Sequence, residues 1–328
     1  MTGYRSILTN LTNGLAPLVM GVFLLSFAGV GARFFWLLEL TTHFRPQYLV
    51  AGAVLLPGVL LSRSRWLLVI LCLSIGLNAV AVVPWYLPRN SASAQIPMVS
   101  SPLTIALANV FYGNQEYDRL LQWVNQHQPD LIVVEEYSPA WEEALTVWDQ
   151  TFPYQIREAR SDAFGIALYS RLPLTQMQIH SFGVRKIPWI EAKLTLGTTP
   201  LTLWGIHPYP PVGAQAARER NALLAEASQQ IQNTKGPNLV LGDLNTSPWS
   251  PIYQDFVNRS ALKNSRQGFG IQPTWSTETP WLATPLDHIL VSPAVAIEDF
   301  EVGPSIGSDH LPVKTIVRIP SYCCKSLL

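Results

Sequence analysis

The hydrophobic positions of the chain follow two different patterns, separated near residue 90. Before that point they form three long runs, Leu15–Ala32, Tyr48–Leu61 and Trp66–Leu87. A helix needs about 20 apolar residues to cross about 30 Å of hydrocarbon, a length that the first and third runs reach or approach. The second run is shorter and contains Pro57, but the third run begins soon after it, which favours a tight helical hairpin. The pattern predicts an all-α membrane anchor over residues 1–90 with about three transmembrane helices.

A cleaved signal peptide is the main alternative for this segment, because Ser91–Ala94 resembles a processing site. The apolar material extends far beyond the core of about 7–15 residues that a signal peptide has. Aromatic residues also stand where membrane interfaces are expected, at Phe34–Trp36 and at Trp85-Tyr86. We therefore predict that the anchor is retained and that residues 91–101, rich in small and polar residues, form a linker.

Beyond the linker, short apolar runs alternate with helical patterns. The expected strands are Leu103–Val110, Leu131–Val134, Phe164–Ser170, Trp189–Leu196, Leu201–Ile206, Asn238–Leu241, Leu286–Val291 and Val313–Ile319. The expected helices are Glu116–Gln128 and Ala214–Asn233, in which apolar residues recur at helical spacing. This mixture predicts an α/β (α+β) sandwich with a sizeable core over residues 102–320, followed by a short tail at 321–328.

Charge is distributed unevenly between the two parts. Six arginines and one glutamate, Glu39, precede residue 95, which leaves 16 Lys/Arg and 21 Asp/Glu for the rest of the chain. A domain that binds the nucleic-acid backbone usually presents a basic face, so this acidic balance disfavours duplex DNA as a substrate. The three cysteines, Cys72, Cys323 and Cys324, provide no disulfide framework.

The arginines bear on membrane orientation as well. Three crossings place the N-terminus and the C-terminal domain on opposite sides of the membrane. With the N-terminus inside, three arginines lie on each side: Arg5, Arg63 and Arg65 within, and Arg33, Arg45 and Arg89 outside. The compact Ser62–Arg65 loop is typical of a cytoplasmic loop. We therefore predict a multi-pass protein of the cell (inner) membrane with an extracytoplasmic C-terminal domain.

Polar residues recur at the ends of the apolar strands, where scaffolds place functional groups. They are Asn109, Glu135, Glu136, His207, Asp243, Asn245, Asp287, His288, Asp309 and His310. Each has an ordinary explanation by itself; Gly242–Asn245, for example, is a common turn sequence. Their coincidence in a chain otherwise poor in charge indicates a functional site.

The chemistry of this set is coherent. Carboxylate and amide oxygens suit Mg²⁺ or Mn²⁺, and the sequence has no His/Cys cluster at zinc-binding spacing. Phosphate-ester hydrolysis needs a cation, a base for water and donors for the developing charge, all of which the set can supply. The chain has no Gly-x-x-x-x-Gly-Lys, Gly-x-Ser-x-Gly or Cys-x-x-Cys sequence.

Six motifs in order give the sequence a family likeness. They are Ala108–Val110, Pro129–Glu136, Gly165–Arg171, Gly242–Asn245, Leu286–Ile289 and Gly307–Val313. With them, residues 102–320 resemble the endonuclease/exonuclease/phosphatase superfamily, and the anchor resembles that of a bacterial membrane-bound branch. The resemblance implies a four-layer α/β sandwich of two packed sheets, mostly antiparallel, with helices outside.

The resemblance also implies a metal site. By motif, Glu136 is the principal ligand of Mg²⁺ or Mn²⁺, with Asn109 and Asp309 beside the metal. Many members have Gln before this glutamate, whereas this chain has Glu135. An additional carboxylate there is expected to raise the pKa of a neighbouring group or to recruit a second cation.

The remaining motif residues are implied to act in catalysis. Asp243 would orient or deprotonate the attacking water, and Asn245 would hold a phosphate oxygen. His207 and His310 would bracket the scissile phosphate, with Asp287 orienting His310. Which group is the general base is left open.

Three functions are considered for a chain with these motifs and this anchor. The leading one is a membrane-anchored phosphodiesterase or phosphomonoesterase whose substrate is a lipid headgroup or a nucleotide. A nuclease acting on DNA or RNA is the alternative. An inactive binding module is disfavoured, because degenerate members usually lose the Glu, the Asp-x-Asn or the Asp-His that this chain retains. The sequence predicts no protein partner.

Overall fold

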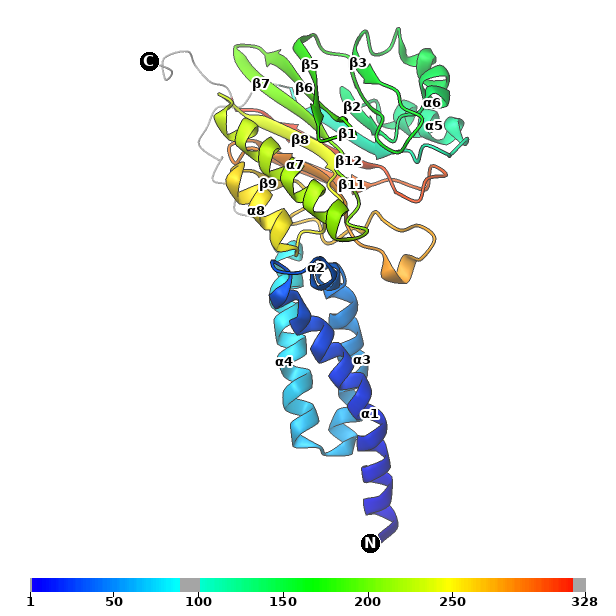
Figure 1. Ribbon diagram of the computed structural model, residues 1–328, viewed down its shortest axis with the longest axis vertical. Coiled ribbons are helices and arrows are strands. Elements are labelled where there is room, and N and C mark those ends of the chain that lie inside the picture. Colours follow the sequence, from blue (N-terminus) through cyan, green and yellow to red (C-terminus); the bar gives the residue numbers. More distant parts are fainter. Residues whose placement is uncertain (1, 89–100, 321–328) are drawn as a thin grey trace.

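The computed structural model describes residues 2–88 and 101–320, and it consists of a helical stalk beneath a β-sandwich (Figure 1). The predicted linker lies outside the described residues except for Ser101. The predicted tail, with Cys323 and Cys324, also lies outside them.

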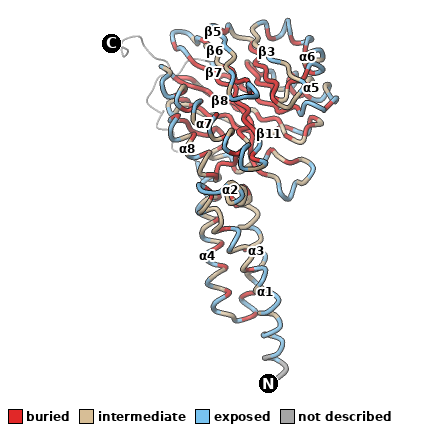
Figure 2. Tube along the Cα trace, viewed as in Figure 1, coloured by how far each residue is buried: buried red, intermediate tan, exposed pale blue. Residues whose placement is uncertain are grey.

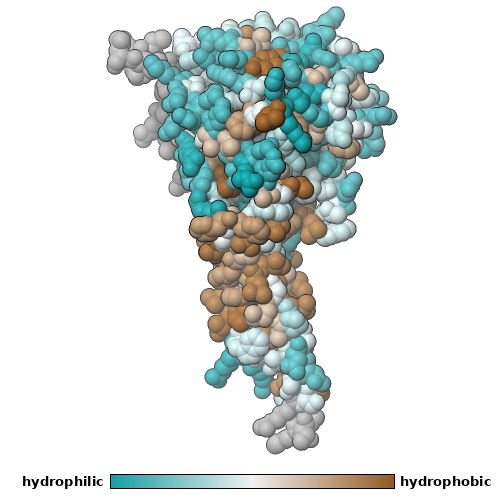
Figure 3. Space-filling view, in the orientation of Figure 1, coloured by the Kyte–Doolittle hydropathy of each residue, from teal (hydrophilic) through white to brown (hydrophobic). Residues whose placement is uncertain are grey.

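The stalk is built from three long helices, α1 (Thr2–Ala28), α3 (Arg45–Ser62) and α4 (Arg65–Val82). They correspond to the three predicted apolar runs, and their outer surface is hydrophobic over the part nearer the sandwich and more polar toward the far end (Figure 3). Two segments, Ser6–Gly31 and Arg65–Tyr86, are long and apolar enough to cross a membrane. A third span is obtained if α3 and the short helix before it are counted as one bent element.

That short helix, α2 (Trp36–Thr42), lies across the end of the stalk that meets the sandwich (Figure 1). The chain bends by 60° between α2 and α3. Helix α3 begins at Arg45-Pro46, a position where proline costs no helical hydrogen bond. The sequence thus provides a new helix start directly after α2.

A buried polar cluster ties the three long helices together at this end. The Nη1 atom of Arg45 donates to the carbonyl oxygen of Ser26 at 2.9 Å and to Oδ1 of Asn78 at 3.2 Å. The Nδ2 atom of Asn78 donates in turn to Oγ of Ser26 at 2.8 Å. Since buried polar groups are costly unless they are paired, this cluster favours one arrangement of the helices.

The sandwich contains two six-stranded sheets. The first has the order β11 (Ala296–Val302), β12 (Val313–Arg318), β1 (Leu103–Asn109), β2 (Leu131–Glu135), β4 (Ile166–Ser170), β3 (Tyr154–Glu158). The second has the order β5 (Leu174–Phe182), β6 (Ile187–Leu196), β7 (Thr199–Ile206), β8 (Asn238–Asp243), β10 (Asp287–Val291), β9 (Lys263–Asn264). Within each sheet one strand pair, β1–β2 or β7–β8, is parallel and the other pairs are antiparallel.

Three apolar cores separate four layers, as predicted. One lies between the sheets and includes Leu107 and Leu241. The second lies between the first sheet and helices α5 (Tyr117–His127) and α6 (Pro139–Ala144). The third lies between the second sheet and helices α7 (Ala214–Asn233) and α8 (Pro251–Arg259). The central strands of each sheet are therefore buried along most of their length (Figure 2), which explains their continuous apolar sequences.

Strand pairing brings the polar strand ends together. Asn109 pairs with Glu135 at the ends of the parallel strands β1 and β2. In the other sheet, Asp243 pairs with Asp287 where β8 ends and the antiparallel β10 begins. Both sets of ends lie at the edge of the sandwich that faces the stalk.

Candidate active site

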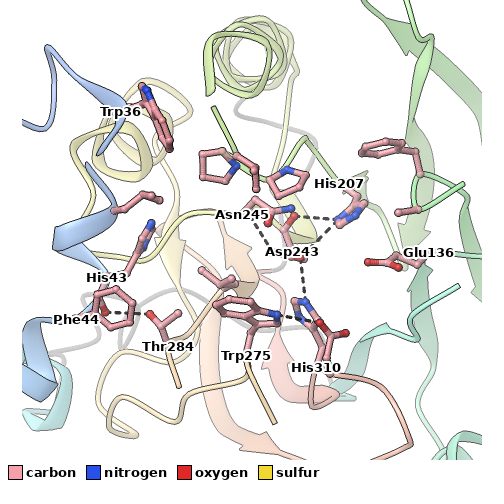
Figure 4. Close-up of a pocket in the computed structure, with 18 of the residues that line it drawn as sticks. Trp36, His43, Phe44, Glu136, His207, Asp243, Asn245, Trp275, Thr284 and His310 are labelled. Carbon is pink, nitrogen blue, oxygen red and sulfur yellow. Dashed lines mark hydrogen bonds and ion pairs between the residues drawn. The ribbon is translucent and has the colours of Figure 1, made fainter. Parts of the chain in front are cut away.

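A cavity of about 670 Å³ lies between α2 and the ends of the central strands. Its lining includes six residues of the predicted site: Glu136, His207, Asp243, Asn245, Asp309 and His310. Figure 4 shows α2 on one side of this cavity and Glu136 on the other, with Asp243 between them. Segments that are distant in the sequence thus form one pocket.

Asp243 is the centre of the polar side of the cavity. Its Oδ2 atom lies 3.5 Å from Nε2 of His310, 3.9 Å from Nδ1 of His207 and 3.4 Å from Nδ2 of Asn109. Its Oδ1 atom accepts a hydrogen bond from the backbone N–H of Asn245 at 2.9 Å. Burial raises the pKa of this carboxyl, and the nearby His310 only partly opposes the effect.

His310 and Asp287 form a buried pair. Nδ1 of His310 lies 2.9 Å from Oδ2 of Asp287. Burial by itself lowers the pKa of His310, but the charges of Asp287 and Asp243 outweigh it and raise the pKa to about 10. Burial likewise raises the pKa of Asp287, and His310 reverses this, so that the pKa of Asp287 lies below its ordinary value. At neutral pH the two groups are an imidazolium and a carboxylate.

Glu136 reaches the cavity because the backbone turns sharply after β2. Its φ is 57°, in the left-handed region, which is uncommon for a side chain of this kind and typical of functional sites. Its Oε1 atom accepts from Nδ2 of Asn109 at 3.2 Å, and its Oε2 atom accepts from the backbone N–H of Tyr112 at 3.1 Å. Asn109 is fully buried, and its Oδ1 atom accepts from the backbone N–H of Phe111.

Asp309 and His207 complete the polar wall. Oδ2 of Asp309 accepts from Nε1 of Trp275 at 3.0 Å, whereas its buried Oδ1 atom has no hydrogen-bond partner among the described residues. Nδ1 of His207 lies 3.3 Å from the carbonyl oxygen of Asp243. Nδ2 of Asn245 donates to the carbonyl oxygen of Pro208 at 3.0 Å, which ties the two site loops together.

The model of the endonuclease/exonuclease/phosphatase family matches residues 106–310, which span most of the sandwich and all of these side chains. The chain belongs to this family. Members are typically metal-dependent hydrolases of phosphoester bonds. Among curated protein sequences, no match was found.

Solved structures with the same fold include family members from several organisms. A D. rerio TDP2 structure, complexed with single strand DNA product, superposes with a TM-score of 0.58 at 16% identity, covering 66% of this chain and 99% of that one. The endonuclease/exonuclease/phosphatase from Bacteroides vulgatus gives a TM-score of 0.57 at 17% identity, covering 67% and 100%. The family protein from Bacteroides thetaiotaomicron gives 0.54 at 18% identity, covering 68% and 99%. At these identities the likeness concerns the fold.

The site suits the divalent metal that members of this family generally use. Within the described ranges, no three His, Cys, Asp or Glu side chains converge as a preformed metal cluster. Mg²⁺ does not need one, because it keeps several waters and binds through one or two carboxylates. Glu136 and Asp309 line the same cavity, and the unpartnered Oδ1 of Asp309 is available as a ligand. The residues present therefore fit a hard cation, with Asn109 orienting Glu136.

Glu135, where many members of the family have Gln, does not line the cavity. It is fully buried beneath it, and its Oε2 atom accepts from the backbone N–H of Asp243 at 2.8 Å. Burial, reinforced by the charge of Asp243, raises its own pKa well above the ordinary value. Glu135 thus supports the floor of the site from beneath by holding the backbone of Asp243, and it does not itself reach the cavity.

The contribution of the stalk to the cavity was not predicted from the sequence. Trp36, Leu37, Leu40, His43 and Phe44 all line the cavity, and they come from α2 and the two residues after it. Trp275, the partner of Asp309, was also missed, because it lies in an irregular loop. One feature of the sequence could have indicated that this segment contributes to the site: Glu39 is the single acidic residue among the first 95.

Proposed function

We propose that this protein is a membrane-anchored, Mg²⁺- or Mn²⁺-dependent phosphoesterase. The observation that supports this most directly is the Asp287–His310–Asp243 chain of contacts, which opens into the same cavity as Glu136 and Asp309. The two long apolar helices support the membrane anchor. Both phosphodiesters and phosphomonoesters are proposed as substrates.

Each side chain has a separate role in the proposed hydrolysis. Asp243, with a raised pKa and a position between two histidines, orients the attacking water and takes its proton. The His310 imidazolium and the Asn245 amide donate to phosphate oxygens as charge develops on them. A divalent cation held by Glu136 and Asp309 would supply further neutralisation of that charge.

A nuclease is the second candidate, because TDP2 with the same fold was solved with a single-stranded DNA product. The acidic balance after residue 95 argues against it. The cavity also argues against a nuclease, because no lysine or arginine is found among the described residues that line it. An inactive binding module is disfavoured because every implied reactive group is present.

The test is an assay of the full-length protein in detergent with Mg²⁺ or Mn²⁺. The panel contains bis-p-nitrophenyl phosphate, p-nitrophenyl phosphate, phospholipids, nucleotides, and single- and double-stranded DNA. We expect metal-dependent release that EDTA abolishes and that Asp243→Ala and His310→Ala reduce by about 10²–10⁴-fold.

The matched control is His180→Ala, because His180 pairs with Glu191 on the second sheet, away from the cavity. It should retain wild-type turnover. Equal residual rates in wild type, Asp243→Ala and His310→Ala would point to a contaminant and would refute the proposal. If DNA is hydrolysed faster than the other substrates, a nuclease becomes the favoured function.

A further inference from the structure

We propose that α2 is part of the substrate-binding site and that the substrate is a membrane-lipid phosphate ester, whose apolar portion packs against α2. This inference rests on the proposed phosphoesterase function and specifies its substrate class. It concerns residues outside the match to the family model, which begins at residue 106.

The first observation is that one cavity has two chemically different walls. The reactive groups described above form one wall. The other comes from α2 and the residues after it, where Figure 4 shows Trp36 and Phe44. Leu37 and Leu40 of α2 also line the cavity. Phe164, Val212 and Leu286 also line the cavity and add further apolar surface. A phosphate group bound at the polar wall would therefore have its substituent directed into an apolar environment, which favours an alkyl or acyl chain over a charged one.

The second observation is that α2 is fixed to the catalytic machinery through buried groups. Oε2 of Glu39 accepts a 2.5 Å hydrogen bond from Nη2 of Arg220, and both side chains are almost fully buried. Oε1 of Glu39 accepts from Oγ of Ser250 at 2.7 Å. The Nη1 atom of Arg220 donates to the carbonyl oxygen of Asn245 at 2.8 Å. The apolar wall thus has a defined position relative to the reactive groups, as a binding surface requires.

The third observation is that this wall continues into the surface that would meet the membrane. Leu37 is 46% exposed, and the preceding Phe34 and Phe35 are 89% and 49% exposed. In Figure 3 the hydrophobic surface of the stalk extends up to the base of the sandwich, where α2 lies. Exposed aromatic residues are typical of the membrane interface. A lipid can therefore present its phosphate to Asp243 while its chains stay in an apolar environment.

The experiment uses a homologous series of alkyl p-nitrophenyl phosphates, from methyl to octyl, with the full-length protein in detergent and Mg²⁺. In each hydrolysis water forms a new P–O bond and the bond to p-nitrophenolate breaks, which leaves the alkyl phosphate. The readout is the ratio of kcat/KM for the octyl ester to that for the methyl ester. We expect this ratio to be about tenfold or more in the wild type, because each buried methylene favours binding.

The test variant is Leu37→Gln, at a half-exposed position where the fold tolerates a polar side chain. Its octyl-to-methyl ratio should fall at least about threefold below that of the wild type. The matched control is Leu282→Gln, because Leu282 is 44% exposed and does not line the cavity. The next residue, Ala283, accepts a hydrogen bond from Gln47 of α3 through its carbonyl oxygen, so the position is near the stalk. Detergent affects all three proteins alike, and thermal melts verify that both variants are folded.

The possible results distinguish failure of the lipid proposal from failure of the phosphoesterase function. A high wild-type ratio that falls in Leu37→Gln and persists in Leu282→Gln supports the lipid proposal. Hydrolysis with the same ratio in all three proteins, or no dependence on chain length, overturns it while the phosphoesterase function stands. No metal-dependent hydrolysis of any ester in the series would instead refute the proposed function itself.

Discussion

At the scale of single residues, the pair of His310 and Asp287 governs the charge of the site. Because the pKa of His310 is raised above its ordinary value of 6.5 to about 10, the contribution of the His310 proton to stability is complete below pH 6.5 and is lost as the pH rises toward 10. In the proposed mechanism the cationic form donates to phosphate. Activity should therefore persist into alkaline solution.

The substitution Asp287→Asn should lower the pH above which activity is lost. Removing the carboxylate 2.9 Å from Nδ1 leaves burial less opposed, so the pKa of His310 falls. We expect the alkaline limb of the pH profile of kcat/KM to move down by about one unit or more. The matched control is Glu191→Gln, which breaks a His–carboxylate contact of the same length at His180. An unchanged alkaline limb in Asp287→Asn would contradict the assignment.

Glu135 provides a second prediction at this scale. The folded state holds its proton more tightly than the unfolded state does, so stability declines as the pH rises above the ordinary carboxyl pKa of 4.5. Glu135→Gln keeps the shape and removes the titration. Thermal melts between pH 5 and pH 9 should show a shallower decline for the variant, which should melt at or above the wild type at pH 8. An equal decline in the two proteins would show that Glu135 is already ionised in the folded protein.

At the scale of elements, two ion pairs between described residues join the stalk to the sandwich, and they should differ strongly in energy. Arg33 and Asp255 lie on the surface, with side chains 55% and 31% exposed. Glu39 and Arg220 lie in the buried contact between α2 and α7. Exposed pairs contribute about 0–1 kcal/mol, whereas breaking a buried pair costs about 3–5 kcal/mol because a charge is left without its partner.

The prediction compares Glu39→Gln with Asp255→Asn. Glu39→Gln should lower the melting temperature of the detergent-solubilised protein clearly, and it should also lower turnover, because Arg220 holds the backbone of Asn245. Asp255→Asn should change both within error. Differential scanning calorimetry and the phosphoesterase assay measure the two effects. Equal destabilisation by the two variants would show that burial does not distinguish the pairs.

At the scale of the whole molecule, the structure bears on membrane orientation. Arg63 and Arg65 are exposed in the turn between α3 and α4, at the end of the stalk away from the sandwich (Figure 1). At the opposite end, Arg33 is paired with Asp255 and Arg45 is buried. Among the described residues of the stalk, the exposed arginines without an acidic partner therefore lie at the far end, and such positive charge favours the cytoplasmic side.

We accordingly expect the sandwich to lie outside the cytoplasm. A reporter that is active only outside the cytoplasm, such as alkaline phosphatase, should be active when fused after Leu328. Fused after Ser64, in the turn between α3 and α4, it should be inactive. The reverse pattern would overturn the orientation. Replacing Arg63 and Arg65 by glutamine should weaken the contrast, because these residues carry the asymmetry.

The sequence by itself determined the fold class and the polar edge of the site. Strands covered on both faces, such as β1, β2 and β8, appear in a sequence as continuous apolar runs, and the residues that end them are conspicuous by contrast. Edge strands were not predicted, because β3, β5 and β11 are partly exposed and lack such runs. Helices α6 and α8 are short and were missed as well.

The tertiary structure alone decided what surrounds the reactive groups. Glu39 and Arg220 are separated by 181 positions, and neither has a local pattern that identifies the other as its partner. Leu37 and Leu40 resemble any other residues of an apolar anchor until the chain bends and places them opposite Asp243. Local sequence encodes which faces are buried, whereas contacts between distant segments depend on how those faces pack. For this reason the polar residues that meet in the cavity could be identified from their motifs, whereas its apolar wall could not.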